Sequence, residues 1–466
     1  MITPRLSHTL AIALSVVILA GCQTTAQRGT PSAPSAVAPS TKAGPSTPVG
    51  QTPMPGLDVE PSKAWLLVGR PEAADLQLIL STTGEVGMEV PAGAPRNHWD
   101  RVVTVSALGD STIVRDEIVQ PGFGGPELRV AGHWQLPTVG HDPTPVGRSL
   151  DGSTIALVES QDDQSAGMSR FAVLEHALMD QVQTAGDAPL RLVRIIELPG
   201  AFEYDTLSPD GRILYVIQHL DERAGGRYQV RAVDVSTGVM RDAVIVDKGN
   251  PDETMAGAPI AQLRREDGLV LTLYDGPAHP FIHALMSTEA WAVCIDLPAD
   301  GSFGAAAAAD PAAALDWGVA ENANGATVYA ANASLGIVVE IDPAQLTVRR
   351  SASIDATAAA PRVVLAKFGH GSVGPTGRRV IVSPDGATLY AAGGGGVVAI
   401  RTKDLTVARH SLAGSAIDAL GITTPGTVLF ALVHGSGEIV ALDAVTGQRL
   451  SAVPGSYDRL LAISPW

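Results

Sequence analysis

The chain contains 466 residues, with 48 acidic and 32 basic side chains, a formal net charge of −16 and a pI near 5.1. This excess of negative charge excludes the basic surface that nucleic-acid binding requires. The two cysteines, Cys22 and Cys294, are too few for a disulfide framework or for the Cys-x-x-Cys-His motif that attaches haem.

The first 22 residues have the composition of an export signal. Arg5 precedes an apolar run from Leu10 to Leu19, which is shorter than the roughly 20 residues of a membrane-spanning helix. The run ends in Leu19-Ala20-Gly21-Cys22, which resembles the lipobox of bacterial lipoproteins. The resemblance implies that residues 1–21 are a signal peptide and that Cys22 carries acyl chains such as palmitate, which anchor the protein to a membrane.

The same resemblance implies an extracytoplasmic location. The protein would lie on the outer face of the cell membrane or, in a cell with two membranes, in the periplasm or at the outer membrane.

Residues 22–62 are rich in Pro, Ser, Thr, Ala and Gly and have few large apolar side chains. Such a segment cannot bury a core, so we expect a disordered tether between the lipid and a folded body.

From about residue 63 to residue 466 the composition changes. Short runs of Val, Ile, Leu and Tyr alternate with Gly, Pro, Asp and Asn, which predicts an all-β body. One segment, Phe171–Gln183, is compatible with a helix or with a strand followed by an insertion.

A turn motif recurs through this body and is followed each time by an apolar run. In its clearest form it reads Ser-Pro-Asp-Gly, where Pro presets φ and Gly supplies the positive φ of a tight turn. The copies are Ser149–Val158, Leu207–Val216, Asn322–Tyr329, Val382–Ala391 and Thr424–Phe430. A third run that ends in an acidic residue often follows, so each unit of about 40–50 residues predicts four antiparallel strands, which is typical of a β-propeller blade.

These repeats resemble the YVTN-type propeller repeats of bacterial lactonase-like and surface proteins. The resemblance is clearest at Leu207–Val235, Val319–Val348 and Val380–Leu412, and it implies a single β-propeller over residues 63–466. Seven units are expected near residues 99–140, 141–200, 203–248, 255–305, 313–355, 362–412 and 415–455.

The two ends of the body complement each other. The tail, Asp458–Pro465, resembles a first strand without the rest of its blade, and the head, Ala64–Val90, resembles three strands without a first. Pairing the N- and C-terminal strands would close the ring and remove both open edges. This gives eight four-stranded blades, or seven if one of the N-terminal units is only an insertion, and the sequence leaves both counts open.

Two histidines form a weak candidate for a metal site. His279 and His283 are four residues apart and would share one face of a strand. No third ligand is close in sequence and Pro280 disfavours a regular strand, so we expect a turn and a cross-strand polar contact, and no cofactor.

The other polar candidates have structural interpretations. His133, His141 and His370 lie beside Gly, Pro or Asp and predict loops, of which those of His141 and His370 could face the central channel where propellers bind ligands. Asp162 and Asp163 lack the spacing of a calcium loop and predict a solvated loop tip.

Three further features are predicted to be purely structural. Cys294 lies in an apolar run and predicts a buried, inert thiol, and Gly393–Gly396 predicts a tight hairpin. Asp234, Asp342 and Asp443 each end a strand and predict a role in the turn that follows.

The leading interpretation is a lipid-anchored, non-catalytic propeller that acts as a binding or scaffold module for a protein or glycan partner in the cell envelope. The alternative is a lactonase-like hydrolase, or another enzyme that uses the central channel. No catalytic residue can be transferred from the resembling family onto this chain. An enzyme should show convergent titratable side chains with shifted pKa values at one end of the channel, and a binding module should show a broader exposed patch.

Overall fold

The computed structural model divides the chain into two compact units, Met1–Leu57 and Asp58–Trp466. The structure describes residues of the second unit only, from 63 to 464, with gaps at 72, 74, 91–92, 96–100, 109–110, 123–124, 138–142, 160–166, 177–189, 222–225, 251–253, 277–278, 299–312 and 357–376. Among these residues no helix has the length and apolar character needed to cross a membrane.

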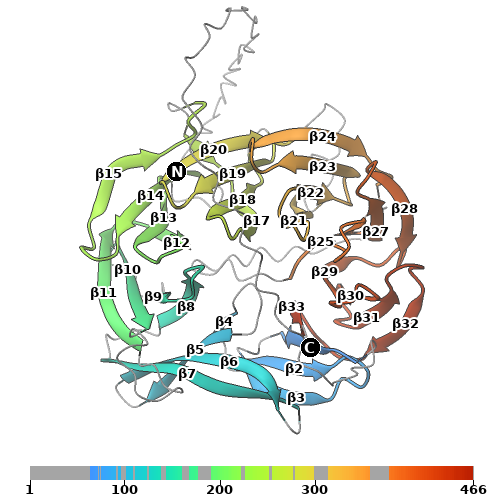
Figure 1. The fold of residues 1–466 in the computed structure, drawn as a ribbon, viewed down its shortest axis with the longest axis horizontal. Helices are drawn as coiled ribbons and strands as arrows, with labels where there is room; N and C mark the ends of the chain where they lie inside the picture. The colour runs from blue at the N-terminus through green and yellow to red at the C-terminus, as the bar shows by residue number, and fades with distance from the viewer. Residues whose placement is uncertain are drawn as a thin grey trace, which may run out of the picture. The chain divides into compact units, whose positions relative to one another are not determined.

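Eight antiparallel sheets form a β-propeller, seven of them built around four sequential strands and one from the first three strands and the last strand of the chain (Figure 1). Blade 1 contains β1 (Trp65–Gly69), β2 (Leu76–Leu80), β3 (Val86–Val90) and β33 (Arg459–Ile463), and blade 2 contains β4 (Gly93–Pro95), β5 (Arg101–Leu108), β6 (Ser111–Gly122) and β7 (Gly125–Pro137). Blade 3 contains β8 (Pro143–Arg148), β9 (Thr154–Glu159), β10 (Met168–His176) and β11 (Leu190–Pro199). Blade 4 contains β12 (Phe202–Leu207), β13 (Ile213–His219), β14 (Arg227–Asp234) and β15 (Met240–Ile245), with the short β16 (Met255–Ala256) added to β14.

The second half of the ring repeats the pattern. Blade 5 contains β17 (Pro259–Arg264), β18 (Leu269–Tyr274), β19 (Phe281–Met286) and β20 (Trp291–Asp296). Blade 6 follows a single 3-10 turn (Ala313–Leu315) and contains β21 (Trp317–Glu321), β22 (Val328–Asn332), β23 (Ile337–Asp342) and β24 (Thr347–Ser353). Blade 7 contains β25 (Val380–Val382), β26 (Thr388–Gly393), β27 (Gly396–Arg401) and β28 (Thr406–Ser411), and blade 8 contains β29 (Ile417–Ile422), β30 (Val428–Val433), β31 (Ile439–Asp443) and β32 (Arg449–Val453).

The innermost strand of each blade faces the middle of the ring in Figure 1, where β12, β17, β21 and β29 are labelled. We call it the first strand of the blade; in blade 1 it is β33. We call the end at which first strands begin and second strands finish the strand-start end. The opposite end, where the turns join first to second and third to fourth strands, is the turn end.

The Ser-Pro-Asp-Gly motif forms the turn between first and second strands. In blade 4 the Ser208 hydroxyl donates to Asp210 at 2.7 Å and accepts from the Ile213 amide at 2.9 Å. Gly211 has a φ of 69°, which a residue with a Cβ adopts only at a cost. Because the motif satisfies its own backbone groups, the same turn recurs around Asp385 in blade 7 and Asp151 in blade 3.

The acidic residue that ends a third strand forms the next turn. Asp443 accepts hydrogen bonds from the Val445 and Thr446 amides at 3.0 and 2.6 Å. Asp342 accepts from the Ala344 and Gln345 amides, and Asp234 is bonded to Ser236 and Thr237. The prediction that these aspartates serve the turns is confirmed.

Each interface between blades contains one cluster of buried apolar side chains. Alternate residues of a strand contribute to opposite neighbours, because successive side chains point to opposite faces of a sheet. In β13, Leu214 and Val216 pack toward blade 3, whereas Tyr215 and Ile217 pack toward blade 5. The tyrosine also bonds across the interface, since its hydroxyl donates to the Ser287 carbonyl of blade 5 at 2.7 Å.

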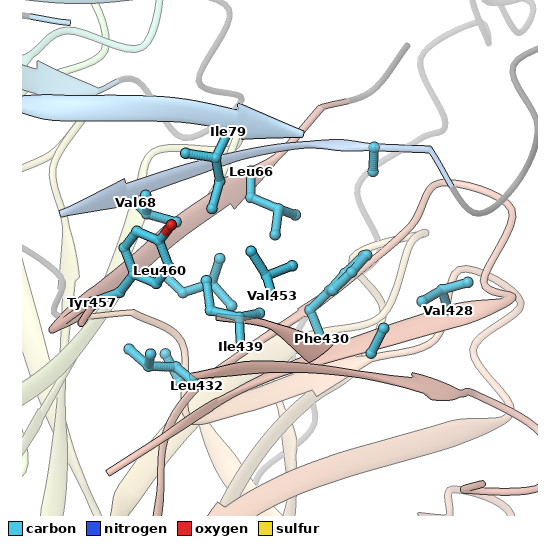
Figure 2. Close-up of a cluster of buried hydrophobic side chains, with 13 residues drawn as sticks. Leu66, Val68, Ile79, Val428, Phe430, Leu432, Ile439, Val453, Tyr457 and Leu460 are labelled. Carbon is cyan, nitrogen blue, oxygen red and sulfur yellow. The ribbon is translucent and has the colours of Figure 1, made fainter. Parts of the chain in front are cut away.

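The ring closes between blade 8 and blade 1, as Figure 2 shows. β33 pairs with β1, placing Ile463 opposite Leu66 and supplying the inner strand that the N-terminal part of the blade lacks. Leu460 of β33 packs in one cluster with Val68 of blade 1 and Phe430 of blade 8. The predicted closure by the two terminal strands is confirmed, and the number of blades is eight.

The first half of Phe171–Gln183 is a strand, and not the helix that the sequence also allowed. Phe171 to His176 belong to β10, whose register with β9 and β11 fixes them as strand, and residues 177–183 lie outside the described part of the chain. Among the residues that the structure describes, the sole helical segment is the 3-10 turn of blade 6.

Candidate functional site

A group of polar and ionisable side chains gathers at the strand-start end of blades 6, 7 and 8. Asp316 immediately precedes β21, Arg379 immediately precedes β25, and Asp418 is the second residue of β29. His434 follows β30 and Ser334 follows β22. We call these five residues the charged cluster, and they come from segments that lie far apart in the sequence.

Arg379 is the centre of the charged cluster. Its Nη1 donates to Asp316 Oδ1 at 2.7 Å, and its Nη2 lies 4.0 Å from Asp418 Oδ1. Asp418 Oδ2 lies 2.9 Å from His434 Nδ1. Burial lowers the pKa of the Arg379 guanidinium from its ordinary value, and the negative charge of Asp418 opposes that change.

The exposure of the cluster increases from one end to the other. Asp316 is 2% exposed, whereas Arg379, Asp418 and His434 are 21%, 23% and 30% exposed. The inner members therefore hold the guanidinium in place, and the outer members remain accessible to a ligand. Arginine and histidine can donate hydrogen bonds and the carboxylate of Asp418 accepts them, so the accessible part suits a polar ligand.

The backbone just before β25 sets the position of Arg379. The carbonyl of Arg378 accepts from the Leu420 amide of β29 at 2.7 Å, and Gly377 forms an isolated bridge with Leu460 of β33. The chain therefore runs along the inner strands of blades 8 and 1 before it enters blade 7. Glycine is needed at position 377 because a Cβ there would overlap that of Ala419.

The four-glycine segment supports the buried end of the cluster. Gly393 pairs with Gly396 across a two-residue hairpin, as predicted, and the Gly394 amide donates to Ser334 Oγ at 2.6 Å. Ser334 in turn donates to Asp316 Oδ2 at 2.5 Å. A Cβ at Gly393 would lie only 2.8 Å from Ser334 Oγ, so the absence of a side chain permits this contact.

Blade 4 carries an acid–histidine pair at the equivalent position. Glu203 is the second residue of β12 and His219 the last of β13, and Glu203 Oε2 lies 3.1 Å from His219 Nε2. These positions correspond to Asp418 and His434. Because blades 4 and 8 are four steps apart in a ring of eight, the two pairs lie on opposite sides of the strand-start end.

Two further ionic groups lie deeper between blades. Asp116 of β6 is fully buried and accepts both Nη atoms of Arg148 in blade 3, at 2.8 and 2.6 Å, while His176 Nε2 lies 2.7 Å from it. Arg265 of blade 5 donates to Glu321 of blade 6 at 2.7 Å. Their burial and their bonding across interfaces indicate that these groups connect blades.

The two histidines of the metal-site hypothesis have different surroundings. His279 precedes β19 and its Nδ1 lies 3.8 Å from Asp296, whereas His283 is 1% exposed within β19. Burial lowers the pKa of His283 to about 4. Among the described residues, no three His, Cys, Asp or Glu side chains are grouped so that they could hold a metal ion.

The other predicted residues are distributed as follows. His133 is exposed within β7, opposite Arg115, and is not on a loop as expected, because the long β6–β7 ladder extends through this position. Cys294 is half-buried and not buried as predicted, because β20 is the edge strand of its blade. Cys22, His141, Asp162, Asp163 and His370 lie outside the described residues.

Comparison with known proteins supports the fold. No family model and no curated protein sequence matches the chain. Apo AztD from Citrobacter koseri superposes with a TM-score of 0.50 at 12% identity, covering 86% of this chain and 98% of that chain.

Two solved structures with lactonase names are also similar. Pseudomonas aeruginosa periplasmic gluconolactonase, PpgL, has a TM-score of 0.43 at 14% identity, covering 85% of this chain and 98% of its own. A putative 6-phosphogluconolactonase from Bacteroides fragilis has a TM-score of 0.41 at 15% identity, with 88% and 99% covered. At such identities the similarity is one of fold.

Proposed function

We propose that this protein is a lipid-anchored, extracytoplasmic binding module whose partner docks at the strand-start end of the ring. The observation that supports the proposal best is the charged cluster, in which blades 7 and 8 bring Arg379, Asp418 and His434 together with part of each side chain exposed. A partner with hydroxyl, amide or charged groups would find donors and acceptors held in fixed positions.

The pairing within the cluster favours binding over catalysis. Arg379 contacts Asp316 and lies near Asp418, and Asp418 in turn contacts His434, so each group already has a partner of suitable charge or hydrogen-bonding type. Such mutual pairing holds the side chains in one conformation, so less side-chain entropy is lost when a partner binds. A rigid ring with polar groups at one end is a suitable scaffold for recognition of a protein or a glycan of the envelope.

The lipid anchor is the second part of the proposal. Acylation of Cys22 would attach the body to a membrane through residues 22–62. Cells labelled with an alkyne analogue of palmitate should yield labelled mature protein, and Cys22→Ala should abolish the label while leaving the protein expressed. Equal labelling of the Cys22→Ala variant would contradict the anchor.

Site-specific photocrosslinking in intact cells tests the docking end. A photoreactive amino acid would replace Ser436, which is exposed in the loop next to His434 and takes no part in the cluster. The matched control would replace Val445, which is 77% exposed at the turn end of the same blade. We expect a discrete adduct from position 436, its loss on adding Arg379→Ala, and no such adduct from position 445.

The same variants distinguish the enzyme alternative. Equal adducts from positions 436 and 445 would contradict docking at the strand-start end. Hydrolysis of D-glucono-1,5-lactone by the purified full-length protein, if abolished by Arg379→Ala and by Asp418→Asn, would replace the binding proposal with a hydrolase.

A further inference from the structure

The interface between blades 4 and 5 contains a group of four buried polar side chains. Asp205, Tyr228, Tyr274 and His283 are each less than 5% exposed. Each of these four side chains has one buried polar atom without a hydrogen-bond partner among the described residues. The atoms are Asp205 Oδ2, Tyr228 Oη, Tyr274 Oη and His283 Nε2.

These side chains face one another across the interface. Tyr228 of β14 stacks on Tyr274 of β18 with ring centroids 4.8 Å apart, and the ring of His283 lies edge-on to Tyr274 at 6.5 Å. Tyr228 and Tyr274 belong to the single apolar cluster of this interface. Thr272, opposite His283 in the sheet, lies two residues before Tyr274 and therefore points to the same side.

A hydrogen-bonded chain connects Asp205 to this group. Gln262 Nε2 donates to Asp205 Oδ1 and to Thr272 Oγ1, both at 3.1 Å. Asp205 is the extra residue of a β-bulge between Tyr204 and Thr206, so its side chain can turn toward blade 5. One carboxyl oxygen is thus satisfied by the protein, and the other is not.

Burial disfavours the charged form of every side chain in the group. Burial raises the pKa of Asp205 to about 7, with a further increase from Glu203 and a decrease from Arg264 and the Gln262 hydrogen bond. Burial lowers the pKa of His283 to about 4 and raises those of Tyr228 and Tyr274 well above 10. Neutral hydroxyl, imidazole and carboxyl groups require donors and acceptors of hydrogen bonds, and they do not require a counter-ion.

We propose that the interface between blades 4 and 5 encloses a hydration site, in which ordered water bridges Asp205, Tyr228, Tyr274 and His283. A buried polar atom without a partner destabilises a fold more than a made hydrogen bond stabilises it, so four such atoms together call for an occupant. Water fits because it both donates and accepts, and buried waters commonly serve two to four polar groups.

Removing single hydroxyl groups from the full-length protein tests the proposal. Tyr274→Phe and Tyr228→Phe should each lower Tm by about 1–3 °C, because each variant deprives the bridging water of a partner. Tyr215→Phe is the matched control, since its hydroxyl donates to the Ser287 carbonyl at 2.7 Å and its loss must lower Tm in either case. A Tm that stays constant or rises in both Tyr274→Phe and Tyr228→Phe, with a fall in Tyr215→Phe, would overturn the proposal, because removing an unpaired hydroxyl relieves a cost.

A high-resolution crystal structure of the wild-type protein gives an independent answer. We expect ordered solvent density within hydrogen-bonding distance of at least two of the four atoms, including Asp205 Oδ2 or Tyr274 Oη. Direct bonding of these atoms to one another, with no solvent density between them, would contradict an enclosed hydration site.

Discussion

Asp205 shows how one buried carboxyl makes the stability of the fold depend on pH near neutrality. Its pKa is raised to about 7 in the folded state, mainly by burial, from an ordinary value of 3.8. Between these two values the folded state binds more protons than the unfolded state. The contribution of Asp205 to stability is therefore complete below about pH 4 and is lost as the pH rises through 7.

Asp205→Asn should remove this dependence while retaining an amide that can meet Gln262. We expect the Tm of the variant minus that of the wild type to increase between pH 5 and pH 7 and to level off toward pH 8, measured by differential scanning calorimetry. Asp234→Asn is the control, because hydrogen bonds from Ser236 and Thr237 lower the pKa of Asp234 and its effect belongs to lower pH. A Tm difference for Asp205→Asn that is constant over this range would show that the group does not titrate there.

Asp116 is also a buried carboxylate, but unlike Asp205 both of its oxygens have charged or hydrogen-bonding partners. Its two bonds to Arg148 and its contact with His176 link blade 2 to blade 3. Asp116→Asn would leave the buried guanidinium without its counter-charge, so we expect a loss of about 3–5 kcal/mol in the free energy of unfolding in urea. Arg212→Ala is the control: it removes an exposed partner of Asp210 and should cost under about 1 kcal/mol. Equal losses of unfolding free energy in the two variants would contradict this account of Asp116.

At the scale of the element, the turns of the blades are self-contained units that also contact the next blade. Gly211 and Gly386 occupy the same position of the Ser-Pro-Asp-Gly turn, with φ of 69° and 72°. A Cβ at position 211 would overlap Thr154 of blade 3, whereas a Cβ at position 386 would meet nothing within 4 Å. Substitution of Gly386 therefore tests backbone strain alone, whereas substitution of Gly211 tests strain together with packing against blade 3.

Gly386→Ala should therefore lower stability by about 1 kcal/mol, the cost of a left-handed residue with a Cβ. Gly211→Ala should add the cost of displacing Thr154 and exceed that loss by about 1–3 kcal/mol. Chemical denaturation of the two variants measures the difference. Equal destabilisation would show that the turn of blade 4 does not pack on blade 3 as described.

The turns after the third strands should respond to acid. Hydrogen bonds from Thr446 and Val445 lower the pKa of Asp443, and hydrogen bonds from Arg349 and the Gln345 amide lower that of Asp342. For such groups the stabilisation is present above the unfolded pKa, near 4, and is lost as the pH falls through the lower folded value. Asp443→Ala should flatten the decline of Tm between pH 5 and pH 3, and a decline as steep as in the wild type would contradict this role.

Strands, turns and closure could be predicted from the sequence because they depend on local patterns. Ser-Pro-Asp-Gly specifies its turn wherever it occurs. The unit at Ala64–Val90 lacks a first strand and Asp458–Pro465 is a first strand without a blade, so the sequence predicts that they pair. The charged cluster depends on contacts of long range. Asp316 and Arg379 are 63 residues apart, and their contact requires the register of two blades and the path of Gly377 across blades 8 and 1.

A weak signal of the site was nevertheless present. Gly393–Gly396 predicted a hairpin, and the structure adds that the absence of a Cβ at Gly393 allows its contact with Ser334. The metal-site hypothesis relied on the spacing of His279 and His283 alone. Spacing predicts a shared face only within one strand, and β19 begins after His279.

At the scale of the whole molecule, every blade has two neighbours because β33 completes blade 1. Without β33, the inner edge of β1 and the apolar faces of Val68 and Phe430 would be exposed. The strand-start end would also lose its geometry, since Gly377, next to the charged cluster, bridges to Leu460 of the same strand. Closure therefore supports both the fold and the proposed docking site.

The most direct test of this account is the thermal unfolding of the chain shortened to end before Asp458, compared with the full-length protein and with Leu460→Ala. Leu460 is 1% exposed, so its truncation should cost about 2–5 kcal/mol and leave a folded ring with a lower Tm. The shortened chain should lose cooperative unfolding or aggregate. A shortened chain that melts cooperatively at the Tm of the full-length protein would contradict a ring closed by its terminal strands.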